Sequence, residues 1–329
     1  MTFPIRAALA VLLFAAPAMG PATPAAAETL RFAHFVAPTH TLTEAIVTPL
    51  TTGVAPSGLV IRTYPAGELG AGPAEQYVRA VQGVADIVWG LPGYTSSQFP
   101  LSMLTEYPGA LPQGMSGADF LWNGHEAGLL AREYPATEPL ALWTAEPAVL
   151  VTRDRAVRAP SDLAGLKIRV SGSVTSGVVQ ALGAIPVQMP AGDVYNALQT
   201  GLVDGVIIGS SGISDFRFDE VLGHVTLGIP LGNQAFYVVA NAARVEALPE
   251  AERAALRAVS GRDLSRHAEA AWNARGAAAI GGLRARDGVV VDLTGAEIAA
   301  FEAVLLPLTE AAIAGLGAEA AIAAMRGAE

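Results

Sequence analysis

One arginine stands inside an apolar segment, at a point where small residues follow. Arg169 lies in the run 167–170, and two serines and a glycine occupy 171–173. Side chains alternate along a strand, so Lys167 and Arg169 would share one face. A guanidinium there offers a planar fork for a carboxylate, and a helix predicted from Val174 would favour an anion at its amino end. The run alone is more typical of an ordinary solvent-exposed arginine, so both interpretations stay open.

No other group of residues has the spacing of a catalytic or metal site. The histidines are scattered, and no pair has metal-ligand spacing on one helical turn. They are His34, His40, His125, His224 and His267. No Gly-x-Ser-x-Gly motif occurs, and the glycine spacing of a phosphate loop at 172–177 is followed by Val178 instead of lysine. The sequence therefore predicts a protein that is not an enzyme and has no metal or cofactor.

Composition limits the partners further. The chain has 329 residues, a net charge of −10, no cysteine and 15% charged residues. An acidic surface argues against nucleic acid as the main partner, because such binding needs cations to displace counterions. The absence of cysteine excludes disulfides, thiolate metal sites and cysteine nucleophiles.

The first residues have the pattern of an export signal. Residues 1–27 contain Arg6, a short apolar run at 7–16 and three alanines at 25–27 before Glu28. Ten apolar residues are too few to span a bilayer, so a membrane anchor is the weaker interpretation. We expect cleavage after Ala27 and a mature chain in a bacterial periplasm.

The elements that would position Arg169 follow a repeated β-α-β pattern. The first unit alternates short β-type runs with helical runs, at 30–35, 38–52, 59–64, from 73 onward and at 85–89. The second unit does the same, at 167–170, 174–182, 185–189, 191–200 and 203–208. Such a pattern predicts parallel strands covered by helices, with ligands at the carboxyl ends of the strands. Phe35 and residues 89–94 would lie at such ends.

The remaining segments would connect two lobes. Strand-like stretches at 140–152 and 234–240 are candidate crossovers between the units. Helical spacing from 249 to 286 predicts a single long helix that could lie across both lobes, with possible kinks at its glycines. A late strand at 289–293 precedes a last helix, for which Thr294 and Glu297 form a capping box.

Several of these segments together resemble a known family. They are 64–70, 83–87, 92–94, 99–101, 162–170, 181–187, 189–190, 193–195, 197–201 and 203–205. In this order and spacing they are similar to the periplasmic solute-binding subunit of TRAP transporters, the DctP-like proteins. The resemblance covers nearly the whole mature chain.

The resemblance implies an α/β fold of two lobes, with hinge strands and a long helix spanning both. Lobe I would comprise 28–146 and 235–274, and lobe II would comprise 147–234 and 275–329. Such a protein captures an organic acid in the interlobe cleft and delivers it to membrane permease subunits driven by an ion gradient. The family's carboxylate anchor falls on Arg169. Looser positions in the implied pocket are Phe35, Trp89, Leu91, Tyr94, Ser173, Ser210 and Phe236, with Ala191 and Gly209 beside them.

Departures from the family pattern indicate the kind of ligand. Residues 146–149 replace a second arginine of many relatives, Leu91 and Tyr94 stand where acid-specific relatives are often polar, and Ile229 replaces a common asparagine. The segment 207–212 also differs. A pocket with fewer charges favours a monocarboxylate with an apolar body over a sugar acid or dicarboxylate. The alternatives are an exported sensor for a membrane kinase, an exported enzyme using the same cleft and a receptor of the ABC type.

Overall fold

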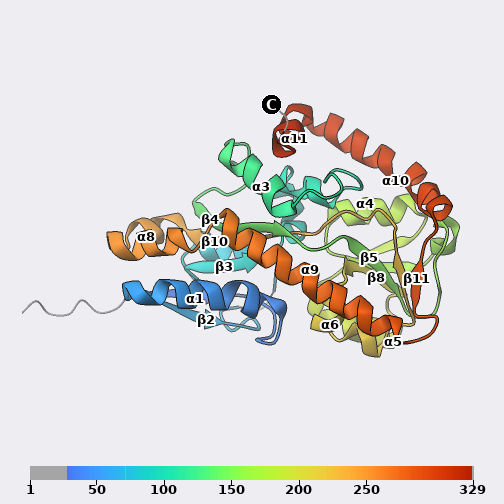
Figure 1. Cartoon of the computed structure of the whole chain (residues 1–329), viewed down its shortest axis with the longest axis horizontal. Helices are drawn as coiled ribbons and strands as arrows, with labels where there is room; N and C mark the ends of the chain where they lie inside the picture. The colour runs from blue at the N-terminus through green and yellow to red at the C-terminus, as the bar shows by residue number, and fades with distance from the viewer. Residues whose placement is uncertain (1–27, 71, 328–329) are drawn as a thin grey trace, which may run out of the picture.

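Two separate β-sheets organise the chain. The computed structural model describes residues 28–70 and 72–327, so the predicted signal peptide at 1–27 lies outside the described residues. The first sheet has the order β2-β1-β3-β10-β4 and the second has the order β11-β9-β5-β8-β6-β7. We call the parts built on these sheets lobe I and lobe II, and they lie side by side (Figure 1). The predicted α/β fold of two lobes is confirmed.

Lobe I combines parallel and antiparallel strands. Its strands are β1 (Thr29–Ala33), β2 (Val60–Tyr64), β3 (Ile87–Gly90), β4 (Thr137–Thr144) and β10 (Ala235–Asn241). Its helices are α1 (Thr48–Val54), α2 (Gln76–Val81), α3 (Gly117–Glu126), α7 (Ala242–Glu246) and α8 (Glu250–Ala258). Strands β1, β2 and β3 pair in parallel, and β10 pairs antiparallel with β3 and β4. Apolar clusters cover both faces of this sheet, which explains the nearly continuous apolar run of β10.

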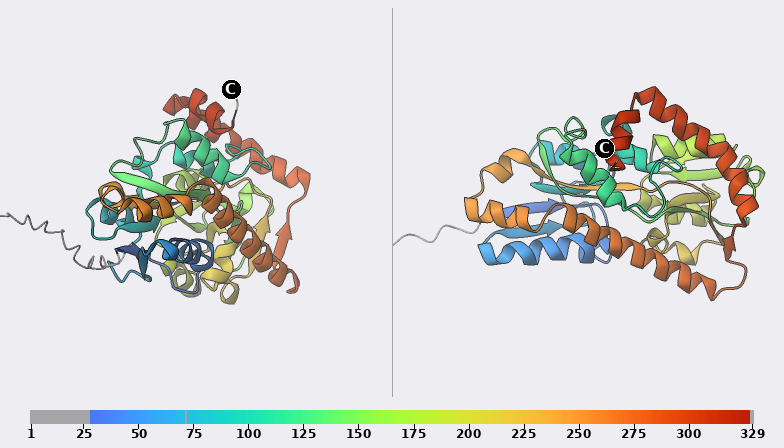
Figure 2. Two further views of the ribbon diagram at one scale, coloured as in Figure 1. Left: turned by 60° about the vertical axis from the view of Figure 1, so that its left-hand side comes forward. Right: turned by 45° about the horizontal axis from the view of Figure 1, so that its top comes forward.

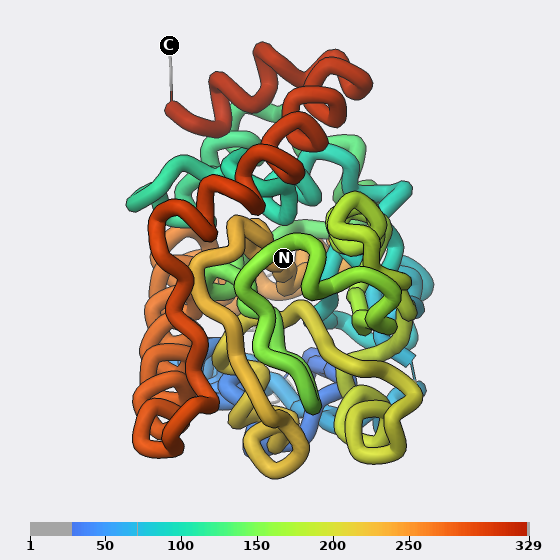
Figure 3. Tube along the Cα trace, turned by 90° about the vertical axis from the view of Figure 1, so that its right-hand side faces the viewer, coloured from blue at the N-terminus to red at the C-terminus, as the bar shows by residue number. Residues whose placement is uncertain are grey.

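Lobe II repeats this arrangement. Its strands are β5 (Ala148–Thr152), β6 (Lys167–Val170), β7 (Ile185–Gln188), β8 (Gly205–Gly209), β9 (His224–Leu227) and β11 (Val290–Asp292). Its shorter helices are α4 (Ser173–Ala181), α5 (Val194–Thr200) and α6 (Ser211–Asp215). The sheet again carries an apolar cluster on each face. Figure 3 views the molecule from the lobe II end.

The chain passes between the lobes at the predicted crossovers. Strand β4 ends in the first sheet at Thr144, and β5 begins in the second sheet at Ala148. The return runs from the end of β9 at Leu227 to the start of β10 at Ala235. These two short connections join the sheets, and together with the strands that they link they would form a hinge.

Helix α9 (Arg262–Arg284) braces both lobes, as Figures 1 and 2 show. Leu264 and Trp272 pack in the lobe I core, whereas Ala279 and Leu283 pack in the lobe II core. With 23 residues it is about 35 Å long. One helix therefore belongs to two cores, and neither lobe can lose it without exposing apolar surface.

The single helix predicted over 249–286 is wrong in one respect. The structure divides that stretch into α8 and α9. Gly261 has a φ of +91°, a conformation that favours glycine, and its N–H donates to the carbonyl of Leu140 in β4 at 2.7 Å. The break is thus fixed to the sheet. The glycines at 276, 281 and 282, which were expected to kink the helix, lie inside α9.

The last two helices return towards lobe I. Helix α10 (Gly295–Leu316) starts at the predicted capping box, where Thr294 N–H donates to Glu297 Oε2 at 2.7 Å. Among the described residues it is the one helix long and apolar enough to cross a membrane by length and composition, yet Phe301 and Leu305 are buried in the lobe II core.

Helix α11 (Glu319–Met325) packs against lobe I, whereas the predicted division of the chain placed it in lobe II. Residues 275–329 were assigned to lobe II, but Ile322 and Met325 pack with the lobe I core under α3. Asn123 of α3 also donates to the carbonyl of Met325 at 3.0 Å. The other predicted lobe boundaries stay a prediction.

Candidate ligand-binding site

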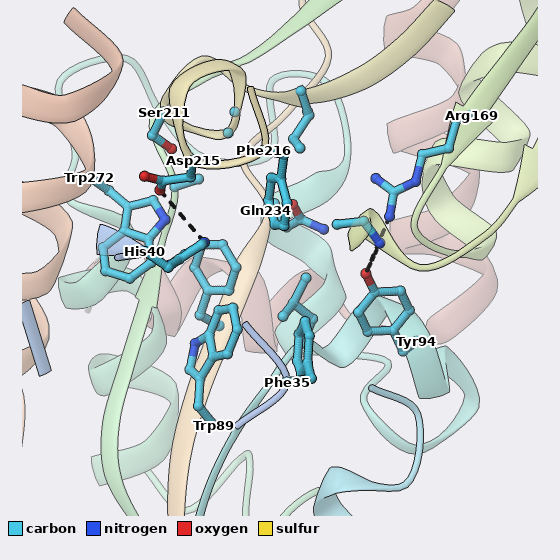
Figure 4. A pocket seen from close by; sticks show the side chains of 17 residues that line it. Phe35, His40, Trp89, Tyr94, Arg169, Ser211, Asp215, Phe216, Gln234 and Trp272 are labelled. Atoms are coloured by element: carbon cyan, nitrogen blue, oxygen red, sulfur yellow. Dashed lines mark hydrogen bonds and ion pairs between the residues drawn. The ribbon is translucent and has the colours of Figure 1, made fainter. Parts of the chain in front are cut away.

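A cavity lies between the lobes (Figure 4). Both lobes and helix α9 contribute to its wall. Its aromatic lining residues are Phe35, Trp89, Tyr94, Phe216, Phe236 and Trp272. Its polar lining residues are His40, Arg169, Ser211, Asp215 and Gln234. The walls of small-molecule sites are typically apolar with a few polar groups, and this lining has that character.

Strand topology explains why these residues meet. Strands β1 and β3 pair in parallel, so Phe35 and Leu91 follow two neighbouring carboxyl ends. In lobe II, β6 and β8 also pair in parallel, and Gly209 closes β8 at the cavity wall. Clefts outside the carboxyl ends of parallel strands are the usual ligand sites of α/β folds.

Arg169 is deeply buried and has no carboxylate partner within the described part of the chain. Its side chain, on β6, leaves only 1% of the residue exposed. Nε donates to the carbonyl of Met189 at 2.9 Å, and Nη2 donates to the Tyr94 hydroxyl at 3.2 Å. Burial lowers the pKa of Arg169 from its usual value, although a guanidinium stays charged at physiological pH. Two of its five N–H donors are used, so the cavity is lined by a cation that still has donors for a ligand.

Two carboxyl groups, Glu106 and then Asp193, act on the charge of this cation, and the one with the larger effect is itself weakened by burial. Glu106 is 1% exposed, and burial raises its pKa to about 8, against the opposing effects of the Ala235 backbone and of Arg169. A carboxyl group with that pKa is mostly protonated at neutral pH. Glu106 therefore leaves the charge of Arg169 largely uncompensated.

The Tyr94 hydroxyl joins the two lobes at this point. Tyr94 comes from lobe I, in the 3-10 helical segment Pro92–Gln98, and its oxygen accepts from Arg169 and from the N–H of Ala191 at 3.0 Å. Both of those donors belong to lobe II. Because the oxygen accepts two bonds, its own proton is free to be donated into the cavity.

Aromatic rings form the wall beside the cation. Phe35 stacks on Trp89 with ring centroids 4.8 Å apart and an interplanar angle of 19°. Trp89 also contacts Phe236 at 5.6 Å, and Phe236 contacts Trp272 at 5.5 Å. Such a layer of rings offers flat apolar surface to a ring or a compact apolar group.

The end of the cavity opposite Arg169 carries a second polar group (Figure 4). His40 Nε2 lies 3.6 Å from Asp215 Oδ2, and Thr41 Oγ1 donates to the same oxygen at 2.7 Å. Arg275 Nε donates to Asp215 Oδ1 at 3.2 Å. Burial lowers the pKa of His40 to about 4, so the ring is neutral at physiological pH.

Further contacts hold the cleft shut. The N–H of Ser173 in lobe II donates to Ser96 Oγ in lobe I at 3.3 Å. The Tyr94 and Thr41 bonds described above also cross between the lobes. Gly172 packs directly on Gly93, where a Cβ would overlap the backbone of Gly93. The structure is therefore that of a closed cleft.

Six of the eight residues predicted for the ligand site line this cavity. They are Phe35, Trp89, Leu91, Tyr94, Arg169 and Phe236. Ser173 and Ser210 do not line it: the N–H of Ser173 donates to Ser96 in lobe I, and Ser210 Oγ donates to Glu146 at 3.2 Å. Contact with a ligand stays a prediction for all eight. The alternative of a solvent-exposed Arg169 is wrong.

Sequence reasoning missed five lining residues that matter chemically. They are His40, Asp215, Phe216, Gln234 and Trp272. Asp215 and Phe216 come one short helix after β8, so their distance from that strand end was an available signal. The sequence contains no such signal for His40, because a lone histidine is more often structural. Within 28–70 and 72–327 no group of three or more metal-binding side chains occurs.

Comparisons with known proteins agree with this geometry. The family model for bacterial extracellular solute-binding protein, family 7 (DctP), matches residues 32–315. A TRAP solute-binding protein from Rhodoferax ferrireducens, solved with copurified benzoate, is 26% identical with a TM-score of 0.83 over 91% of this chain and 96% of that one. A Bordetella bronchiseptica protein, solved with both enantiomers of mandelate, is 25% identical with a TM-score of 0.82 over 91% and 98%.

Curated relatives match over shorter regions. The ectoine-binding periplasmic protein TeaA of Halomonas elongata is 29% identical over 150 residues, which is 44% of this chain and 43% of that relative. The chain spans less than half the length of the curated relatives it matches. The family match nevertheless covers most of the chain, and the solved relatives share its whole two-lobe fold. The chain belongs to the bacterial extracellular solute-binding protein family 7 and is a solute-binding protein of the TRAP type.

Proposed function

We propose that this protein captures a monocarboxylate with an aromatic or otherwise apolar body in the periplasm and delivers it to the membrane permease of a TRAP transporter. One observation carries the proposal: the buried Arg169 has free donors, no carboxylate partner among the described residues and an aromatic wall beside it. A buried charge without a partner is costly, so an anionic ligand supplies what this site lacks. Benzoate and mandelate, found in two relatives, have this chemistry.

Binding would work by closure of the cleft. Arg169 comes from lobe II and Tyr94 from lobe I, and both have hydrogen-bond donors left for one carboxylate. Those contacts to a ligand exist together only when the lobes meet, so the ligand shifts the equilibrium towards the closed form. The closed form is what a permease would recognise. No step in this cycle changes the ligand chemically.

The test is isothermal titration calorimetry of the mature protein against two sets of acids. The first set is benzoate, mandelate and phenylacetate, and the second is succinate, fumarate and glucuronate. We expect binding in the first set to be at least about tenfold tighter, because the wall is apolar and one cation is present. Tight binding of C4-dicarboxylates without binding of apolar monoacids would overturn the proposal. Mass spectrometry of ligand recovered after binding should return it unchanged.

A further inference from the structure

Two polar side chains lie together at the end of the cavity opposite Arg169. They are His40 from lobe I and Asp215 at the end of α6 in lobe II, and both line the cavity. His40 is 7% exposed, and the Asp215 side chain is 1% exposed. The anchor for the carboxylate lies at the other end, with aromatic rings between (Figure 4).

The hydrogen bonds of His40 assign its tautomer. The N–H of Leu42 donates to His40 Nδ1 at 3.1 Å, so Nδ1 is an acceptor and the proton of the neutral ring is on Nε2. The Asp215 oxygen is 3.6 Å away from Nε2, which exceeds the length of a normal hydrogen bond. Within residues 28–70 and 72–327 the Nε2–H thus has no acceptor at normal hydrogen-bond distance, and it belongs to a residue of the cavity wall.

Asp215 is held in place by other residues. Thr41 Oγ1 donates to Oδ2 at 2.7 Å, and Arg275 Nε donates to Oδ1 at 3.2 Å. A carboxylate oxygen has more than one acceptor position, so Oδ2 can accept a further bond. Donor and acceptor therefore lie side by side, 3.6 Å apart, at one point of the cavity wall.

We propose that His40 and Asp215 recognise a hydroxyl group on the part of the ligand remote from its carboxylate. A hydroxyl oxygen about 2.8 Å from both atoms would accept from Nε2–H and donate to Oδ2. The same pair disfavours a second carboxylate, because that anion would face the Asp215 carboxylate, whose other oxygen is paired with Arg275, with a neutral imidazole beside it. The inference deepens the proposed function and rests on it: the ligand class becomes hydroxylated aromatic monocarboxylates.

The test compares acids that differ only at one ring position. Calorimetry would measure benzoate, the three hydroxybenzoates and benzene-1,4-dicarboxylate on the wild type. We expect the 3- or 4-hydroxy acid to bind at least about tenfold tighter than benzoate. The 2-hydroxy acid is an internal control because its hydroxyl lies next to the carboxylate. The dicarboxylate should bind more weakly than benzoate.

Two variants assign the preference to this pair. His40→Phe should reduce the ratio of hydroxy-acid affinity to benzoate affinity to about twofold or less, whatever the substitution does to benzoate binding itself. Asp215→Asn keeps an oxygen and removes the charge, so binding of the dicarboxylate should improve relative to benzoate. His267→Gln, which alters an exposed histidine on α9, is the matched control and should leave all ratios unchanged. Circular dichroism would verify that each variant is folded.

The outcomes distinguish failure of this inference from failure of the proposed function. If benzoate binds and no hydroxy acid binds more tightly, or if the preference survives in His40→Phe, the inference is overturned while the proposed function stands. If neither benzoate nor any hydroxybenzoate binds, the proposed function fails first. If His40→Phe does not fold, Asp215→Asn is the deciding variant: the ratio of its affinity for the dicarboxylate to its affinity for benzoate must rise above that of the wild type.

Discussion

Closure of the cleft depends on a contact between two glycines, and we expect Gly172→Ala to prevent it. Gly172 precedes α4 in lobe II, and a Cβ there would lie 2.9 Å from the carbonyl carbon and the Cα of Gly93 in lobe I. Its φ of −162° is extended backbone that alanine adopts without strain. The substitution therefore acts on the approach of the lobes and leaves each lobe able to fold.

The size of the effect follows from the contacts nearby. Carbon atoms pack at about 3.5–4.0 Å, so the lobes must separate by roughly 1 Å at this point. Three interlobe hydrogen bonds of 3.0–3.3 Å, from Arg169 and Ala191 to Tyr94 and from Ser173 to Ser96, would then exceed bonding distance. At about 0.5–1.5 kcal/mol each, their loss amounts to roughly 1.5–4.5 kcal/mol. Ligand affinity should fall by about 10- to 1,000-fold.

Two measurements test this expectation. Calorimetry with benzoate, or with whichever acid the panel identifies, gives the loss of affinity. Small-angle X-ray scattering with and without ligand gives the compaction on binding, which should be smaller in Gly172→Ala than in wild type. Gly177→Ala is the matched control, since Gly177 lies in the same helix and nothing stands within 4 Å of the place its new methyl group would take. That control should bind as wild type and gain a little stability.

The reasoning is refuted if Gly172→Ala binds within twofold of wild type and compacts equally. A loss of affinity in both glycine variants would also count against it, because α4 as a whole would then be the sensitive element. A drop in thermal stability of the ligand-free Gly172→Ala protein would indicate damage to lobe II, and we expect none.

Other predictions concern the cation and its neighbours. Arg169→Ala and Arg169→Lys should each weaken binding of the acid at least about tenfold, because neither retains the planar fork; unchanged affinity in both would reject the site. Tyr94→Phe removes the hydroxyl that Arg169 and Ala191 contact, so the affinity for the acid, measured by calorimetry, should fall about five- to thirtyfold with little change in melting temperature. Burial raises the pKa of Glu106 from 4.5 to about 8, so the folded chain binds this proton more tightly than the unfolded chain, and the free energy of unfolding falls as pH rises across that window. Glu106→Gln should therefore gain melting temperature over wild type by about 2 °C or more at pH 8 and less at pH 5; a pH-independent difference would contradict the assignment.

Local patterns predicted the parts of the fold that depend on local chemistry. Strand β6 lies at 167–170 as predicted, and the capping box of Thr294 and Glu297 forms. The break between α8 and α9 was missed because it depends on a bond from Gly261 to Leu140, more than a hundred residues away in sequence. Helical spacing continues through that break, so the pattern itself contains no sign of it.

The candidate site was predictable where the family pattern points to a residue and not where two lobes create the environment. Alternation placed Arg169 on the polar face of its strand, but the structure buries it, and the Tyr94 hydroxyl that it contacts comes from the other lobe. The pairing of His40 with Asp215 likewise joins positions 175 apart that only closure brings together. The periodicity of a single sequence does not predict contacts between residues of two different lobes.

The burial of an unpaired cation also explains why closure should require a ligand. With the cleft shut, Arg169 loses water and gains from lobe I only the neutral Tyr94 hydroxyl, in addition to the Met189 carbonyl of its own lobe, while protonated Glu106 supplies little negative charge. Desolvating a charge without an opposite partner costs several kcal/mol, so the empty protein should favour the open form. A carboxylate cancels that cost when it enters, whereas a neutral molecule of the same shape does not. Arg169 would therefore both select the anion and make closure conditional on it, and under the proposed function a permease could then distinguish loaded from empty protein.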